Sequence, residues 1–106
     1  MYKPLPTSLT IKQSGIDGLG LFAKEGIAQG ANLGMSHVLI GSGIIRTPMG
    51  GFINHSDDAN VVKVELRIDE KDDALLKVAT KKWNLIALRN IKEGEELTVR
   101  YTFYDI

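Results

Sequence analysis

The chain has 106 residues, with 13 Lys and Arg against 13 Asp and Glu, and it contains no cysteine. This length suits one compact domain, and we therefore expect a single domain over residues 1–106. The balanced charge argues against direct nucleic-acid binding, which normally requires a basic excess or stripe. The absence of cysteine excludes disulfides, thiolate zinc sites and a cysteine nucleophile.

Hydropathy argues against a membrane location. No apolar run approaches the roughly 20 residues that a membrane-spanning helix needs. The N-terminal residues lack the apolar segment of a secretory signal peptide. We therefore expect a soluble, intracellular protein, cytoplasmic in the simplest case, with no membrane partner.

The predicted elements of the first half are short strands separated by glycines, and ten of the 11 glycines lie in residues 1–60. Apolar runs at 9–13, 21–23 and 37–40 predict three strands. No stretch of the chain holds apolar residues at helical spacing for more than about two turns. The first half therefore favours an all-β arrangement.

The second half contains the clearest strand. Residues 62–68 alternate apolar and charged side chains, which predicts one buried apolar face and one solvent-facing face. A charged turn over 69–73 and a returning strand over 74–80 would complete a hairpin. Residues 85–88 predict a central strand buried on both faces, and 97–101 predict a further strand. The fold class is mainly β, with many short strands.

Trp83 follows two lysines at the entrance of a predicted strand. The position favours packing on an edge strand, and stacking on a ligand is the alternative. The pair Asp57 and Asp58 could attract a basic peptide, but two acids in a loop are more often only solvated.

An internal repetition links the two halves. Residues 23–33 and 87–97 share the frame A-x-x-x-I-x-x-G-x-x-L. Five common residues in eleven positions can match by chance. The alternative is a pair of β units related by a two-fold axis.

Three segments carry polar or glycine-rich patterns that chemistry could use. Residues 15–23 read G-I-D-G-L-G-L-F-A, where glycines form a hairpin loop or let the backbone approach a ligand. The dinucleotide fingerprint is absent, since G-x-G-x-x-G followed by a helix does not occur here.

The second segment, residues 50–60, places Asn54, His55 and Ser56 in a row. A loop-ordering Asx turn would explain them. A metal site is unfavourable because the chain has only two histidines and no evident third ligand, and a Ser/His hydrolase is unfavourable because Ser56 lacks a nucleophile elbow. The third segment, 94–104, places Tyr101 and Phe103 on one face of a strand, which ordinarily indicates core packing.

Taken in order, the three segments resemble the SET-domain family of S-adenosylmethionine-dependent protein-lysine methyltransferases. The family pattern is approximately G-x-G-L-F-A, then R-F-I-N-H-S-C-x-P-N, then G-E-E-L-T-x-x-Y. This sequence has G-L-G-L-F-A at 18–23, F-I-N-H-S at 52–56 with Asn60, and G-E-E-L-T at 94–98 with Tyr101. The resemblance implies a β-clip fold of short sheets whose C-terminal segment passes beneath a loop as a pseudoknot.

The resemblance also implies roles for individual residues. Backbone around Gly18, Leu19 and Gly20 would hold the methionine end of S-adenosylmethionine, and Asn54 and His55 would bind its amino and adenine parts. Tyr101 would be the active-site tyrosine. The substrate channel would involve Val99, Phe103 and Tyr104. No metal is implied, and the expected partner is a protein with an exposed lysine.

The sequence also departs from the family pattern. Gly51, Asp57, Ala59 and Arg100 stand where the family commonly has Arg, Cys, Pro and an acidic residue. About a dozen residues separate Ile40 from Phe52, where relatives carry a larger insert, and no cysteine-rich tail follows Tyr101. This minimal form is similar to compact viral and bacterial SET proteins. We therefore expect Phe103, Tyr104 and Ile106, or a second subunit in a homodimer, to close the channel.

Two other functional classes compete with the methyltransferase. A SET-like domain without catalysis could serve as a binding or assembly module, which the missing insert, the missing tail and Gly51 favour. A small β domain with purely structural glycine loops is the third hypothesis. Binding of S-adenosylmethionine discriminates the first class from the third.

Overall fold

The fold is mainly β, as the sequence predicts. The structure, a computed structural model, describes residues 5–41, 43–67 and 79–100. Its elements, in chain order, are β1 (Leu9–Gln13), β2 (Leu19–Ala23), β3 (Asn32–Ile40), β4 (Gly43–Arg46), α1 (Pro48–Phe52), β5 (Asn54–His55), β6 (Val61–Arg67), β7 (Ala79–Ala87) and β8 (Glu96–Val99).

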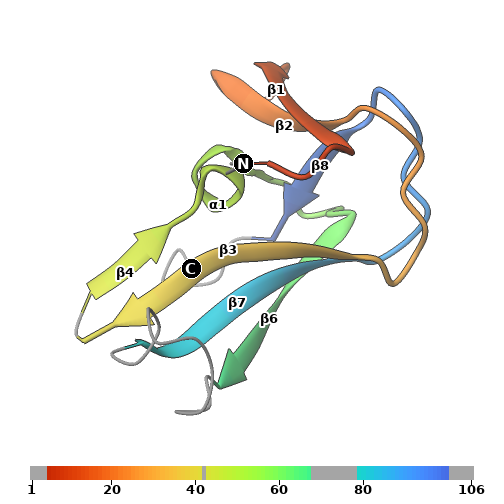
Figure 1. The fold of residues 1–106 in the computed structure, drawn as a ribbon. Coiled ribbons are helices and arrows are strands. Elements are labelled where there is room, and N and C mark those ends of the chain that lie inside the picture. Colours follow the sequence, from red (N-terminus) through yellow and green to blue (C-terminus); the bar gives the residue numbers. More distant parts are fainter. Residues whose placement is uncertain (1–4, 42, 68–78, 101–106) are drawn as a thin grey trace.

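The described strands form one continuous hydrogen-bonded system with the order β1-β2-β8-β6-β7-β3-β4, and β5 pairs with β8 outside this path. Figure 1 shows β1, β2 and β8 at the top and β6, β7, β3 and β4 spread below them. Neighbouring strands are antiparallel, except that β8 runs parallel to β5 and to β6. Strand β8 therefore joins the two groups of strands and also receives the short β5.

The core lies where these groups meet. Leu21 on β2, Leu85 on β7 and Leu97 on β8 are fully buried, and Ile91 and Val61 are nearly so. Burying aliphatic side chains of this size stabilises the fold by roughly 1.5–3 kcal/mol each. Because β2, β8, β6 and β7 all contribute to this core, these four strands are held in fixed relative positions.

Residues at the start of the short helix α1 explain why it forms there. Thr47 is its N-cap: the Thr47 hydroxyl accepts a hydrogen bond from the Gly50 amide at 3.3 Å, and Pro48 occupies the first helical turn. The Thr47 hydroxyl also donates to the Met35 carbonyl at 2.8 Å, which ties the helix to β3. The helix leads through Ile53 directly into β5, so it sets where Asn54 lies.

Most predicted strands are confirmed, with changed bounds. The strand predicted over 9–13 coincides with β1, and those predicted at 21–23 and 37–40 are the ends of β2 and β3. Strand β4 and helix α1 have no counterpart in the prediction. Strand β4 is an edge strand whose four residues are exposed, so its pairing with β3 rather than a buried apolar face accounts for it.

The predicted turn over 69–73 and residues 74–78 of the predicted returning strand lie outside the described residues. Within them, β6 pairs antiparallel with residues 81–87 of β7, from Val61↔Ala87 to Arg67↔Lys81. Residues 85–88 do not form a separate strand, because β7 continues unbroken from Ala79 to Ala87. Pairing with β6 on one side and β3 on the other extends β7 across the two lysines that precede Trp83.

The burial expected along these strands is also partly wrong. The predicted buried face of β6 is exposed, with Val62, Val64 and Leu66 at 36%, 38% and 38% relative accessibility. Val61 is the buried residue of β6, and along the same face Lys63 is half-buried while Glu65 and Arg67 are exposed. On β7, Leu85 and Ala87 are buried while Ile86 is only half-buried, and Leu88 beyond the strand is exposed.

Trp83 lies in the middle of a central strand rather than on an edge strand. Its ring meets His37 of β3 edge to face, with the centroids 6.4 Å apart and the planes at 88°. This geometry is favourable for an aromatic pair. Trp83 is therefore a half-buried side chain of β7 that packs against β3.

The internal repetition is a real two-fold relation. Ile27 and Ile91 exchange two backbone hydrogen bonds, each of 2.8 Å. The Gly30 amide donates to the Ala87 carbonyl, and the equivalent Gly94 amide donates to the Ala23 carbonyl, again at 2.8 Å in both cases. Gly30 and Gly94 have φ of +86° and +88°, which only glycine adopts readily. The shared frame thus encodes two equivalent turns that pair with each other.

Candidate functional site

The glycine-rich segment forms the connection between β1 and β2. The Ser14 amide donates to the Gly18 carbonyl at 2.7 Å and closes this loop. Gly18 has φ of +44°, and a Cβ placed on it would meet no atom within 4 Å. Leu19 is exposed beside it. The segment is therefore the hairpin loop that the sequence offered as one alternative, and its backbone at Gly18 is open.

Asn54 lies against this loop, although some 40 residues separate them in sequence. Strand β5 runs parallel to β8 with Asn54 opposite Thr98, and this places the Asn54 side chain beneath the loop. Its Nδ2 atom donates to the carbonyl oxygens of Asp17 and Leu19, at 3.1 and 3.3 Å. The structure therefore brings Asn54 together with the loop that contains Gly18, Leu19 and Gly20.

Ser14 and Glu96 complete this cluster, although the sequence motifs assigned no role to either residue. Ser14 Oγ lies 2.8 Å from both carboxylate oxygens of Glu96, and Asn54 Nδ2 lies 2.9 Å from Glu96 Oε2 and 3.1 Å from Ser14 Oγ. Glu96 belongs to the matched G-E-E-L-T segment, so the sequence could have indicated it as a site residue. No motif includes Ser14, which precedes the G-L-G-L-F-A motif at 18–23.

Gly20 has a different role from Gly18. A Cβ placed on Gly20 would overlap Glu96 Oε2 and lie 3.0 Å from the Ser14 Cβ. Gly20 is buried in β2 opposite Lys12. Glycine at this position leaves the space in which the Glu96 carboxylate approaches the β2 backbone, and an added Cβ would displace that carboxylate.

His55 follows Asn54 on β5 and points elsewhere. Its Nε2 lies 3.1 Å from Asp57 Oδ1, and its side chain is 38% exposed. The backbone of β5 places His55 opposite Val99, and the Ser56 amide donates to the Val99 carbonyl at 3.2 Å. His55 therefore lies at the carboxyl end of β8, away from the loop cluster around Asn54.

The Asn60 side chain forms two hydrogen bonds with the backbone of β8. It is 2% exposed, its Nδ2 donates to the Glu96 carbonyl at 2.9 Å, and its Oδ1 accepts from the Thr98 amide at 2.8 Å. These two bonds satisfy backbone groups on β8 just as a neighbouring strand would. Asn60 thus supports both Glu96 and the end of the strand that precedes Tyr101.

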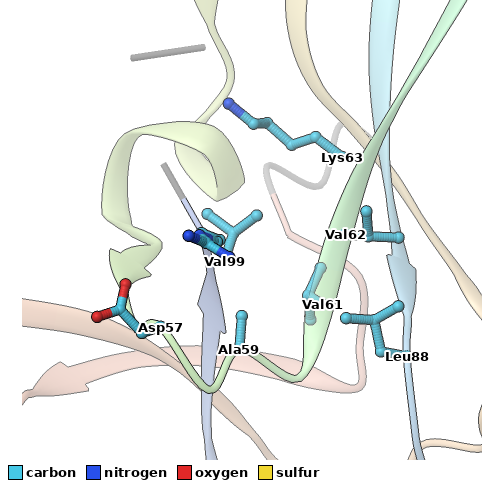
Figure 2. Close-up of a pocket in the computed structure, with 8 residues that line it drawn as sticks. Asp57, Ala59, Val61, Val62, Lys63, Leu88 and Val99 are labelled. Carbon is cyan, nitrogen blue, oxygen red and sulfur yellow. The ribbon is translucent and has the colours of Figure 1, made fainter. Parts of the chain in front are cut away.

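A pocket of about 290 Å³ lies beside the carboxyl end of β8. Its walls are mainly apolar, and Figure 2 shows Val99 between the Asp57–Ala59 segment and strand β6. Its lining residues are Asp57, Ala59, Val61, Val62, Lys63, Leu88, Val99 and Arg100. Val99, which the sequence assigned to a substrate channel, therefore lines an actual pocket.

A buried histidine lies close to α1. Burial, and secondarily the charges of Lys63 and Arg46, lower the pKa of His37 from 6.5 to about 4. The Ser36 hydroxyl donates to the Trp83 carbonyl at 3.1 Å and lies 2.9 Å from His37 Nδ1. Because a hydroxyl has one proton, Nδ1 must carry the imidazole proton and donate to Ser36. His37 is therefore a neutral, structural side chain at neutral pH.

The remaining predicted site residues, Tyr101, Phe103 and Tyr104, lie outside the described residues, as do Ile106 and the predicted pseudoknot. Arg100, the last described residue, is exposed. Over 5–41, 43–67 and 79–100, no group of three or more His, Asp or Glu side chains could hold a metal ion. The helix in this same part of the chain is neither long nor apolar enough to cross a membrane.

Comparison with known proteins identifies the family. A profile of the SET domain matches residues 35–102, which is more than half of the chain. The chain therefore belongs to the SET domain family. No curated protein matches the sequence significantly.

Solved structures share the fold. A protein of Plasmodium falciparum assigned to the histone methyltransferases superimposes with a TM-score of 0.72 at 19% identity, covering 93% of this chain and 96% of the other. The Polycomb Repressive Complex 2 of Chaetomium thermophilum, in an autoinhibited conformation bound to S-adenosylmethionine, gives a TM-score of 0.67 at 19% identity. That match covers 89% of this chain and only 15% of the other. At these identities the likeness establishes the SET fold.

Proposed function

We propose that this protein transfers a methyl group from S-adenosylmethionine to a lysine side chain of a protein substrate. The observation that carries the proposal is the convergence of Asn54 with the loop around Gly18. Asn54 and the carbonyl oxygens of Asp17 and Leu19 meet within 3.3 Å across 35–37 residues of sequence. Membership of the SET domain family supports the same assignment.

The residues of this cluster suit the methionine end of the cofactor. The carbonyl oxygens of Asp17 and Leu19 supply hydrogen-bond acceptors, which a positively charged α-ammonium requires. The open backbone at Gly18 leaves room beside them. When bound, S-adenosylmethionine supplies an electrophilic methyl group on its sulfonium. We assign Gly18, Leu19, Gly20 and Asn54 to the methionine end and His55 to the adenine end.

The pocket beside β8 is the proposed acceptor site. Its apolar residues, among them Val61, Ala59 and Val99, suit the aliphatic part of a lysine side chain. An amine must lose its proton before it can attack the methyl group, and an apolar environment lowers the pKa of an ammonium. The pocket therefore favours the reactive, neutral form of the substrate amine.

Tyr101 is the proposed active-site tyrosine because it follows Arg100 at the rim of this pocket in sequence. Its hydroxyl would position the amine and accept weak C–H···O contacts from the methyl group. Phe103 and Tyr104, from the same chain or from a second copy in a homodimer, would complete the channel. Sedimentation checks the dimer: full activity with a monomeric protein at working concentration would remove it.

The alternative function is a SET-like binding or assembly module without catalysis. The specific observation in its favour is Gly51, which stands where the family pattern has an arginine. A Cβ on Gly51 would meet no atom within 4 Å, so this position is open where the family pattern has a long, charged side chain.

Two experiments separate these functions. Calorimetric titration with S-adenosylmethionine comes first, and absence of binding would refute the proposed function. Transfer of a radiolabelled methyl group to basic proteins comes second, with Tyr101→Phe compared with Tyr2→Phe, a tyrosine outside the three motifs. We expect Tyr101→Phe to reduce transfer at least about tenfold while Tyr2→Phe leaves it unchanged. Binding without transfer in the wild type would establish the module instead.

A further inference from the structure

The Glu96 carboxylate lies at the centre of the cofactor cluster. Ser14 Oγ lies 2.8 Å from both of its oxygens, and Asn54 Nδ2 lies 2.9 Å from Oε2. The Cβ-free backbone of Gly20 makes room for it. One half-buried carboxylate therefore joins three segments: the loop after β1, strand β5 and the beginning of β8.

These contacts determine the orientation of the Asn54 amide. Every oxygen around Nδ2 is an acceptor, since the Ser14 hydroxyl donates its proton to Glu96 and the Asp17 and Leu19 oxygens are carbonyls. A flipped amide would turn Oδ1 toward a carboxylate and two carbonyls, which is repulsive. The amide nitrogen therefore faces the loop and Oδ1 faces away from it.

Asn54 Oδ1 has no hydrogen-bond partner within the described part of the chain. It is an oriented acceptor at the edge of the loop whose backbone is open at Gly18. A ligand that donates hydrogen bonds, such as an ammonium group, would satisfy it.

We propose that Glu96 is a positioning residue that holds Asn54 and the Ser14–Gly20 loop in the arrangement that binds the cofactor's α-ammonium. This inference rests on the proposed function and deepens it. Glu96 acts through Asn54 and Ser14, and glycine at position 20 leaves the space that its carboxylate occupies. Loss of the carboxylate would free the Asn54 amide to rotate without removing any residue that touches the cofactor.

The test compares Glu96→Gln with Glu93→Gln, an exposed glutamate of the same turn. Glutamine keeps the shape of the side chain but offers Ser14 and Asn54 only one acceptor oxygen between them. Binding is measured by calorimetry with two ligands: S-adenosylhomocysteine, which has the α-ammonium, and methylthioadenosine, which lacks the amino-acid part. Thermal unfolding of each variant accompanies the titrations.

We expect Glu96→Gln to weaken S-adenosylhomocysteine binding about tenfold to a hundredfold, the usual effect of losing a charged hydrogen bond, and methylthioadenosine binding less than about twofold. Glu93→Gln should change neither. If Glu96→Gln does not fold, Ser14→Ala should give the same difference between ligands, because it removes an acceptor of the Asn54 amide and the hydroxyl that donates to Glu96.

Three outcomes contradict this inference. Equal weakening of both ligands would indicate general disruption of the fold rather than positioning, and unchanged binding of both would show that the carboxylate is dispensable. Failure of the wild-type protein to bind either ligand would instead refute the proposed function, and the inference with it. The wild-type titration thus separates the two failures.

Discussion

Two adjacent glycines in α1 provide a matched test of the packing that positions Asn54. A Cβ on Gly50 would overlap the Ser36 carbonyl oxygen and lie 3.0 Å from His37 Cε1, whereas a Cβ on Gly51 would meet nothing within 4 Å. Both residues are helical, so alanine suits both backbones. Gly50→Ala and Gly51→Ala therefore differ only in the space around the added methyl group.

The two substitutions should change the free energy of unfolding in opposite directions. In Gly51→Ala, the reduced freedom of the unfolded chain stabilises the protein by about 0.5–1 kcal/mol. In Gly50→Ala the same gain is exceeded by overpacking against the β3 backbone, which costs about 1–3 kcal/mol because a main-chain carbonyl cannot rotate away. Since about 1 kcal/mol corresponds to roughly 4–8 °C in a domain of this size, the two variants should differ in Tm by roughly 4–24 °C.

The assay is thermal and urea unfolding followed by the fluorescence of Trp83, the single tryptophan of the chain. Trp83 contacts His37, which faces the Gly50 position, so its emission also reports local repacking. Gly50→Ala should unfold at a lower temperature than the wild type and Gly51→Ala at an equal or higher temperature. A Gly50→Ala protein as stable as Gly51→Ala would refute the close approach of α1 to β3.

Three other predictions concern stability. The pKa of His37 is about 4 in the folded state and 6.5 in the unfolded state, so protonation of His37 favours unfolding and the free energy of unfolding falls as the pH drops from 6.5 toward 4. Urea titrations of wild type and His37→Gln should show that the variant lacks about 3 kcal/mol of this pH dependence. Asn60→Ala should cost about 2–4 kcal/mol in urea unfolding because it leaves buried β8 backbone groups unpaired, whereas Asn90→Ala, which removes one exposed bond, should cost less than about 1 kcal/mol. Gly30→Ala and Gly94→Ala should lower stability equally, by about 1–2 kcal/mol each, and clearly unequal losses would contradict the two-fold relation of their turns.

The predictions for His37 and Asn60 each have a result that would contradict them. Identical pH dependence of wild type and His37→Gln would mean that His37 is solvated or paired in its charged form. A harmless Asn60→Ala would mean that β8 is held by packing alone, without the two side-chain bonds.

Local sequence information was sufficient for several elements. The run at 9–13 coincides with β1, and the A-x-x-x-I-x-x-G-x-x-L frame predicted two equivalent turns whose glycines both have positive φ. These features depend on side-chain alternation and on glycine, which act within a few residues. Such signals are readable from sequence because their physical cause is local.

Burial and strand pairing were less predictable. The alternation in β6 correctly predicted a strand, yet its apolar residues Val62, Val64 and Leu66 are exposed. Alternation specifies that two faces differ, but which face is covered depends on the elements packed against it. The length of β7 was missed for a similar reason, since pairing with both β6 and β3 extends it through polar residues.

The sequence by itself determined the family resemblance, the mainly β class and the segments that carry Gly18, Asn54 and Glu96. Only the tertiary structure decided how these segments combine. It turned the Asn54 nitrogen toward Asp17 and Leu19, placed Glu96 against Gly20, and gave Ser14 a role that no motif indicated. The physical reason is that hydrogen bonds between residues some 40 to 80 positions apart depend on the pairing of β2, β5 and β8, which no local pattern records.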